Sequence, residues 1–223
     1  LDADRRPNRD DIDDLLTWII IGVIVGGRLG YVLFYNFHYY SANLLEALQI
    51  WHGGMSFHGG VMGVFFAMFA YERVKKVCLL SMADIVCAAA PIGLFFGRIA
   101  NFINAELVGR PSENWGVVFP GDDFARHPSQ LYEAVLEGLI LFAILNFLIR
   151  NDSYRNVRGA VAGAFLLGYG CFRFIIEFFR EPDAQIGFYF DVFTQGQLLC
   201  LPMIIIGGAL IVYRFIRVNQ VKP

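Results

Sequence analysis

Six long apolar stretches constrain this chain more than any other feature of its sequence. They cover residues 15–35, 56–71, 82–104, 129–149, 159–179 and 194–213. A helix needs about twenty mostly apolar residues to cross the hydrocarbon core of a bilayer. The stretches come near that length, with 56–71 the shortest, so the sequence predicts an all-α bundle of about six transmembrane helices. Pro91 falls inside the third stretch, where neighbouring helices can satisfy the carbonyl group that it frees.

The composition supports an integral membrane protein. Of the 223 residues, 57% are hydrophobic and 17% are charged, and the mean hydropathy is +0.51; these values lie outside the usual range of a soluble domain. The 18 basic residues are dispersed, so we expect no nucleic-acid partner. The cysteines are far apart and fit no metal-ligand spacing, so we expect small core residues and no metal site: Cys78, Cys87, Cys171 and Cys200.

Basic residues in the connections predict how the helices are oriented. They gather before the first stretch and after the second, fourth and sixth: Arg5, Arg6, Arg9, Arg73, Lys75, Lys76, Arg150, Arg155, Arg158, Arg214, Arg217 and Lys222. By the positive-inside rule these segments are cytoplasmic, and so is the C-terminus. The long outer connection at 105–127 is rich in glycine and proline, which predicts a small periplasmic cap within a single membrane domain, 1–223.

The informative ionisable residues inside the apolar stretches are Arg28, Arg98, Glu133, Glu137, Arg173 and Glu177. An arginine at the centre of a membrane helix costs about 2.5–3.5 kcal/mol on insertion scales, so each charge needs a partner, a watery cavity or a function. Several such residues in one chain indicate a shared polar site.

The fifth stretch carries the most regular polar pattern. Tyr169, Arg173, Glu177 and Arg180 are spaced by four, four and three residues, which stacks them on one helix face. We expect that face to point into the bundle. A self-neutralising pair of Arg173 and Glu177 without any function remains an equal alternative.

In the third stretch, Arg98 and Asn101 lie on one helix face, with Asn104 one turn further on. A guanidinium group and two amides offer many donors and suit a phosphate. The alternative is that these side chains join helices through hydrogen bonds.

The second and fourth stretches each begin with a polar motif. His58 lies in a Ser-Phe-His-Gly-Gly segment and can change protonation near neutral pH, although it could also be structural. Gln130, Glu133 and Glu137 share one face of the fourth helix. Glu133 could orient an arginine of another helix or form a buried ion pair, and the ion pair is the favoured interpretation for Glu137.

Together these motifs resemble those of bacterial prolipoprotein diacylglyceryl transferases, from the first residues to near the end of the chain. The matching segments are 26–31, 54–60, 97–106, 126–133 and 168–183. The family pattern has a further first span with a functionally important tyrosine, so we expect this chain, which opens on Leu1, to be N-terminally truncated. A glycine that is usual in the third motif is Ala105 here, and its effect depends on whether that position needs a positive φ.

The resemblance implies transfer of an sn-1,2-diacylglyceryl group from phosphatidylglycerol to the lipobox cysteine thiol of a prolipoprotein, in the bacterial inner membrane. Glycerol phosphate is released, and no metal or organic cofactor is implied. The positions that match functional residues of the family are Arg98, Asn101, Glu106, Gly109, Tyr169, Arg173 and Glu177, and His58 matches a proposed base.

Two interpretations from other classes remain. Inward charges on glycine-broken helices also line the substrate paths of transporters and channels, although we detect no internal repeat. A non-catalytic protein could use the same arginines to hold anionic lipid headgroups. Such a protein would bind phosphatidylglycerol without releasing glycerol phosphate.

Overall fold

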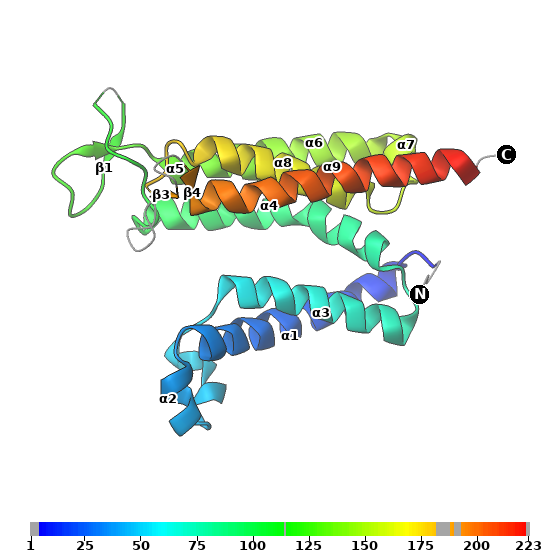
Figure 1. The fold of residues 1–223 in the computed structure, drawn as a ribbon, viewed down its shortest axis with the longest axis horizontal. Coiled ribbons are helices and arrows are strands. Elements are labelled where there is room, and N and C mark those ends of the chain that lie inside the picture. The colour runs from blue at the N-terminus through cyan, green and yellow to red at the C-terminus, as the bar shows by residue number, and fades with distance from the viewer. Residues whose placement is uncertain (1–4, 114, 182–187, 190–192, 222–223) are drawn as a thin grey trace. The chain divides into compact units, whose positions relative to one another are not determined.

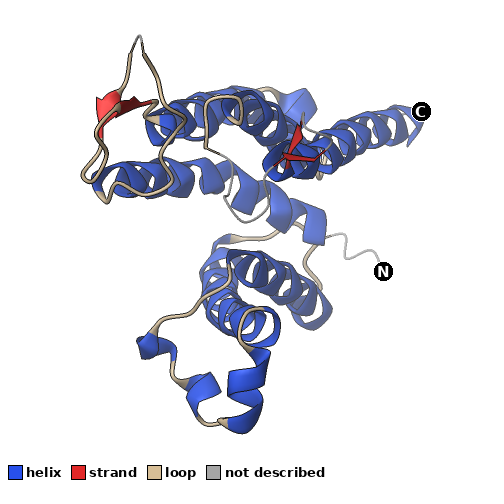
Figure 2. Ribbon diagram, turned by 60° about the vertical axis from the view of Figure 1, so that its left-hand side comes forward, coloured by secondary structure: helices blue, strands red, loops and turns tan. Residues whose placement is uncertain are grey.

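The computed structural model describes residues 5–113, 115–181, 188–189 and 193–221, with side chains omitted at 188, 189, 193 and 217–221. Pro182, Asp183, Lys222 and the side chain of Arg217, which the motifs and the charge pattern include, lie outside this description. The backbone divides into two compact units, Leu1–Ala83 and Asp84–Pro223. Figures 1 and 2 show that most of the described chain is helical.

The first unit is a pair of antiparallel helices joined by a partly helical loop. Its elements are α1 (Arg9–Phe34), α2 (Phe37–Ala42), the short 3-10 helices η1 (Glu46–Leu48) and η2 (Ile50–His52), and α3 (Phe57–Lys75). The apolar pattern predicted a first helix from residue 15, but α1 begins at Arg9. Asn8 and Asp11 cause this earlier start, because each side chain accepts a hydrogen bond from the backbone N–H of the other.

The second unit contains most of α4 (Leu79–Ile103) and all later elements. These are β1 (Val117–Val118), β2 (Ala125–Arg126), α5 (Ser129–Glu133), the π-helix η3 (Ala134–Ile140), α6 (Leu141–Arg150), α7 (Asp152–Arg155), α8 (Ala160–Ile176), β3 (Phe188–Tyr189), β4 (Phe193–Thr194) and α9 (Gln195–Val221). The strands form two antiparallel pairs, β1 with β2 and β3 with β4. They are the red segments in Figure 2 and add a minor β component to the predicted all-α fold.

All six apolar stretches are helical in the structure. Four helices of the described chain are long and apolar enough to cross a membrane: Arg9–Phe34, Leu79–Ile103, Ser129–Arg150 and Gln195–Ile216. The helix Ala160–Ile176 is apolar but shorter, and it ends before residue 179, where the apolar stretch ends. A multi-pass membrane bundle is therefore supported, and the count of six spans stays a prediction.

Glycines bring α1 and α3 into close contact, side by side in Figure 1. A Cβ atom added to Gly63 would lie 1.9 Å from the carbonyl oxygen of Gly22, and one on Gly26 would lie 2.4 Å from that of Gly59. Such distances exclude any side chain. The small residues therefore let the two backbones touch, as in closely packed membrane helices.

Arg28 of α1 organises the loop that joins the two helices. It is 5% exposed and donates hydrogen bonds to the carbonyl oxygens of Ala47, Gly53 and Glu46 at 2.6–2.8 Å. Its guanidinium carbon also lies 5.0 Å from the ring centre of Tyr40. One of the charges predicted to need a partner is thus satisfied by loop carbonyls, and Arg28 belongs to the framework of the first unit.

In the second unit, Asp84 joins α4 to the start of α8. Its carboxylate accepts hydrogen bonds from the backbone N–H groups of Gly159 at 2.7 Å and Ala162 at 2.8 Å. Gly159 provides no side-chain cap for α8, so Asp84 satisfies amides that would otherwise lack acceptors. Because Arg98 lies on α4 and Arg173 on α8, this contact helps to set the register of the two arginines.

Candidate active site

The polar centre of the second unit is Glu133, the last residue of α5. Its carboxylate is fully buried and lies between two arginines of other helices. Oε1 lies 2.5 Å from Nη1 of Arg173, and Oε2 lies 2.6 Å from Nε of Arg98. The first contact is a hydrogen bond; in the second, the distance fits an ion pair but the N–H group is not aligned for a hydrogen bond.

Further carboxylates surround Arg173. Glu177 Oε2 lies 3.0 Å from Nη2 of Arg173, and Glu137 Oε1 lies 3.9 Å from its Nη1. Glu133 also lies 3.7 Å from Nη1 of Arg180. The pair of Arg173 and Glu177 within one helix turn therefore exists, but it is part of a larger cluster. An arginine held on two sides by carboxylates keeps a fixed orientation.

Glu137 differs from the other two glutamates. It is fully buried on the π-helix η3, and neither of its carboxylate oxygens has a hydrogen-bond partner among the described residues. The neighbouring Gly138 allows close approach to α4, because a Cβ atom there would lie 2.7 Å from that of Phe95. The close contact between η3 and α4 brings Glu137 toward the cluster, where Arg173 is its ion-pair partner.

Polar contacts around Glu177 continue to α9. Thr194 Oγ1 donates a hydrogen bond to Glu177 Oε1 at 3.0 Å. Thr194 and Gln197 also cap α9 reciprocally, each through its side chain and the backbone N–H of the other. The Thr-x-x-Gln pattern is typical of the start of a helix, so the sequence does carry a signal for this cap. Its link to Glu177 depends on tertiary packing and has no signal in the sequence.

The end of α4 carries a second set of predicted residues. Asn101 Oδ1 accepts a hydrogen bond from Nη1 of Arg98 at 3.4 Å, and Asn101 Nδ2 donates one to Glu106 Oε2 at 2.9 Å. Gln130 holds this segment to α5 by donating to the Glu106 carbonyl oxygen at 2.6 Å. Arg98, Asn101 and Glu106 thus form one connected chain of side chains.

The turn between Asn101 and Glu106 requires unusual backbone angles. Ala105 has a φ of +55°, in the left-handed region that favours glycine. The position therefore does need a positive φ, and alanine occupies it with some strain.

Gly109 lies where two backbone segments approach it. A Cβ atom there would lie 2.4 Å from the carbonyl oxygen of His127 and 2.7 Å from that of Phe179. The Gly109 N–H donates to the His127 carbonyl at 3.0 Å. Gly109 therefore fastens the 105–127 loop to the start of α5 and to the end of α8, and any other residue would force these segments apart.

Tyr169 and His58 lie apart from these contacts. Tyr169 is one turn before Arg173 on α8, where it stacks on Phe165 and packs against the core of Leu141, Leu145 and Val161. His58 is exposed near the start of α3, in the first unit, next to Ser56, which caps that helix. The structure thus brings Arg98, Asn101, Glu106, Arg173 and Glu177 together around Glu133, and it places His58 in the other unit.

The guanidinium groups of the cluster are donors that could meet an anion. Two guanidinium groups face one carboxylate, and their side chains are 17% and 12% exposed at Arg98 and Arg173. Fixed, permanently charged fork-shaped donors suit a phosphate. Among the described residues, no group of three or more histidine, cysteine, aspartate or glutamate side chains could hold a metal ion.

Comparisons with known proteins identify the family of the chain. A family model described as prolipoprotein diacylglyceryl transferase matches residues 2–213. A phosphatidylglycerol–prolipoprotein diacylglyceryl transferase of Azospirillum brasilense is 55% identical over 206 residues, covering 91% of this chain and 77% of its own. The enzymes of the same name from Rhodospirillum rubrum and Photobacterium profundum are 51% and 52% identical to this chain. Each match spans 96% of this chain, and the two matches span 77% and 82% of the relatives' own lengths.

Proposed function

Because the chain belongs to the prolipoprotein diacylglyceryl transferase family, we propose that it transfers the diacylglyceryl group of phosphatidylglycerol to the lipobox cysteine thiol of prolipoproteins. The thiol sulfur attacks the glycerol carbon that bears the phosphate, the carbon–oxygen bond breaks, and glycerol phosphate leaves. A thioether forms, and the thiol proton passes to a base and then to the leaving group or to water. The observation that carries this proposal is the pair of arginines held by Glu133.

In this proposal Arg98 and Arg173 bind the headgroup phosphate. Charge builds up on the phosphate oxygens as the carbon–oxygen bond breaks, and pre-oriented guanidinium groups stabilise that charge. Glu133 acts as a positioning residue, because one rigid carboxylate fixes both arginines. Glu177 holds Arg173 from the other side, and Asn101 donates to phosphate or glycerol oxygens. Glu106 and Gly109 shape the edge of the site, and Tyr169 supports it from one helix turn before Arg173.

His58 is the proposed base. A thiol with a pKa of about 8.5 costs roughly 2 kcal/mol to ionise at pH 7, a modest demand on a general base. No metal or organic cofactor takes part. Replacing His58 with glutamine should lower transfer and shift its pH profile; an unshifted profile would assign the proton to another group.

The remaining parts of the proposal concern the membrane. We place the protein in the bacterial inner membrane with six spans, a cytoplasmic C-terminus and the 105–127 loop as a periplasmic cap. The positive-inside pattern supports this arrangement. Two contacts support a cap: β1 pairs with β2 within the loop, and Trp115 donates from Nε1 to the hydroxyl of Tyr132 on α5 at 2.6 Å.

The test uses the purified protein in phosphatidylglycerol vesicles with a synthetic lipobox peptide. Mass spectrometry should detect a thioether-linked diacylglyceryl peptide, together with free glycerol phosphate. Product should be lost when Arg98 or Arg173 is replaced with glutamine. Lipid binding without glycerol phosphate release would instead indicate a lipid-binding protein, and substrate flux without lipid turnover would indicate a transporter.

A further inference from the structure

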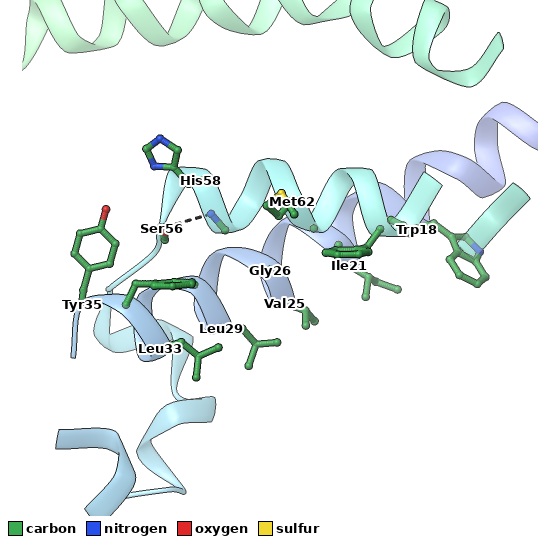
Figure 3. Close-up of a pocket in the computed structure, with 17 residues that line it drawn as sticks. Trp18, Ile21, Val25, Gly26, Leu29, Leu33, Tyr35, Ser56, His58 and Met62 are labelled. Carbon is green, nitrogen blue, oxygen red and sulfur yellow. Dashed lines mark hydrogen bonds between the residues drawn. The ribbon is translucent and has the colours of Figure 1, made fainter. Parts of the chain in front are cut away.

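An apolar groove runs along the first unit, between α1 and α3. It has a volume of about 990 Å³, and its lining extends from Trp18 to Tyr35 along α1. Glycines form its floor, because the two backbones meet where no side chain intervenes. Its walls carry exposed apolar side chains, among them Val25 and Leu29 of α1 and Met62 of α3. Figure 3 shows these side chains along the groove.

Hydroxyl and imidazole groups lie at one end of the groove only. Tyr35, Ser56 and His58 mark that end, and Trp18 lies near the other, as Figure 3 shows. The polar end coincides with the motif that holds the proposed base. A ligand that matches the groove is therefore elongated and apolar, and it carries its reactive group at the end that lies beside His58.

We infer that this groove binds the apolar helix of the precursor's signal sequence and presents the cysteine that follows it to His58. This inference rests on the proposed function. The apolar core of a signal sequence has about 7–15 residues, or roughly 10–22 Å as a helix. The groove is about 25 Å long from Trp18 to Tyr35 at 1.5 Å per residue, so it is long enough for a helix of this length to lie along it.

The groove fits a helix better than an acyl chain. One leaflet of the hydrocarbon core is roughly 15 Å thick, half of the bilayer core. An extended acyl chain would therefore end about 10 Å short of the groove's length, whereas the longest signal helices come within about 3 Å of it. Where two helices meet through glycines, the surface between them is a groove, and a third helix can pack its side chains into that groove. Apolar side chains line both walls, which suits a segment that is apolar on all sides.

Two adjacent residues of α1 provide a matched test. Val25 lines the groove, whereas Ile24 does not, and both are exposed, at 48% and 39%. Val25→Trp fills the groove and should raise KM for the lipobox peptide by roughly tenfold, since overpacking opposes binding. KM for phosphatidylglycerol, varied as its fraction in the vesicles, should not change. Ile24→Trp should leave both values within about twofold of the unsubstituted protein.

A second measurement does not depend on turnover. A lipobox peptide with a benzophenone group in its apolar segment should crosslink to the groove walls, near Leu29 or Met62. A peptide with the group well after the cysteine should not crosslink there. Because crosslinking reports binding alone, it remains informative if the unsubstituted protein makes no product, a result that would contradict the proposed function but not the groove assignment.

Three outcomes would overturn the inference. If Val25→Trp raises KM for the lipid and not for the peptide, the groove holds acyl chains. If it changes the oligomeric state and neither KM, the groove is a contact with a second copy. Crosslinks from the apolar segment that map outside α1 and α3 would also overturn it.

Discussion

At the scale of single residues, the sharing of Glu133 between two arginines determines how the site should respond to substitution. Arg173 makes contacts on three sides, with Glu133 at 2.5 Å, Glu177 at 3.0 Å and Glu137 at 3.9 Å. Only a flat guanidinium group has enough donors to keep such contacts and still meet a phosphate. The shape of this group therefore matters as much as its charge.

Arg173→Lys should lower kcat for thioether formation by about 100-fold or more, because loss of one oriented donor typically costs that much. The positive charge stays, so a purely electrostatic role would leave turnover close to normal and would contradict the prediction. Arg155→Lys is the control. Arg155 pairs with Asp152 at the surface, where both side chains are more than half exposed, so its replacement should have little effect.

Ala105 is a position where a substitution should stabilise the protein. Its φ of +55° lies in the region that costs a residue with a Cβ roughly 1–2 kcal/mol. Ala105→Gly should therefore raise the free energy of unfolding by about 1 kcal/mol, after the larger entropy of an unfolded glycine is deducted. Equilibrium unfolding in detergent would measure this change. Ala100→Gly, inside α4, should instead lower stability by about 1 kcal/mol.

At the scale of elements, the contact between α1 and α3 depends on the absence of side chains. Gly63→Ala would place a Cβ atom 1.9 Å from the Gly22 carbonyl oxygen, so the helices must separate. We expect a loss of several kcal/mol in stability and disruption of the groove. Gly93→Ala, on α4, has no atom within 4 Å of the added Cβ and should be neutral or slightly stabilising. Equal behaviour of the two variants in thermal unfolding would contradict this packing.

The elements also show what the sequence could predict. The length of the apolar stretches predicted all six helical regions, because burial in lipid leaves a long and simple signal. It missed the early start of α1 at Arg9, which depends on the cap formed by Asn8 and Asp11. It could not identify the partners of Arg28 either. These are carbonyl groups of an irregular loop, whose conformation follows no period.

The residues of the candidate site could be predicted from the sequence, but the contacts between them could not. Arg98, Glu133 and Arg173 were identifiable because charges inside apolar helices need a reason. Their common contact could not be read from the sequence, because it joins α4, α5 and α8, whose relative positions depend on packing. Thr194 as the partner of Glu177 was hidden for the same reason.

At the scale of the whole molecule, the proposed topology makes a prediction about accessibility. Glu113 lies in the 105–127 loop, and Ser153 lies on α7, after the predicted fourth span; both are exposed. One span separates them if the proposed arrangement is correct. The two positions should then face opposite sides of the membrane.

Cysteines placed at these positions would report the side directly, in a protein whose four native cysteines are replaced by alanine. In intact spheroplasts, a membrane-impermeant maleimide should label Glu113→Cys at once and Ser153→Cys only after permeabilisation. The physical reason is that Arg150, Arg155 and Arg158 lie near Ser153, and basic residues favour the cytoplasmic side. Labelling of both positions from outside would mean that the helix Ser129–Arg150 does not cross the membrane. The cap, the span count and the side of the C-terminus would then all have to be reassigned together. All three assignments rest on the same pattern, in which every second connection along the chain carries basic residues.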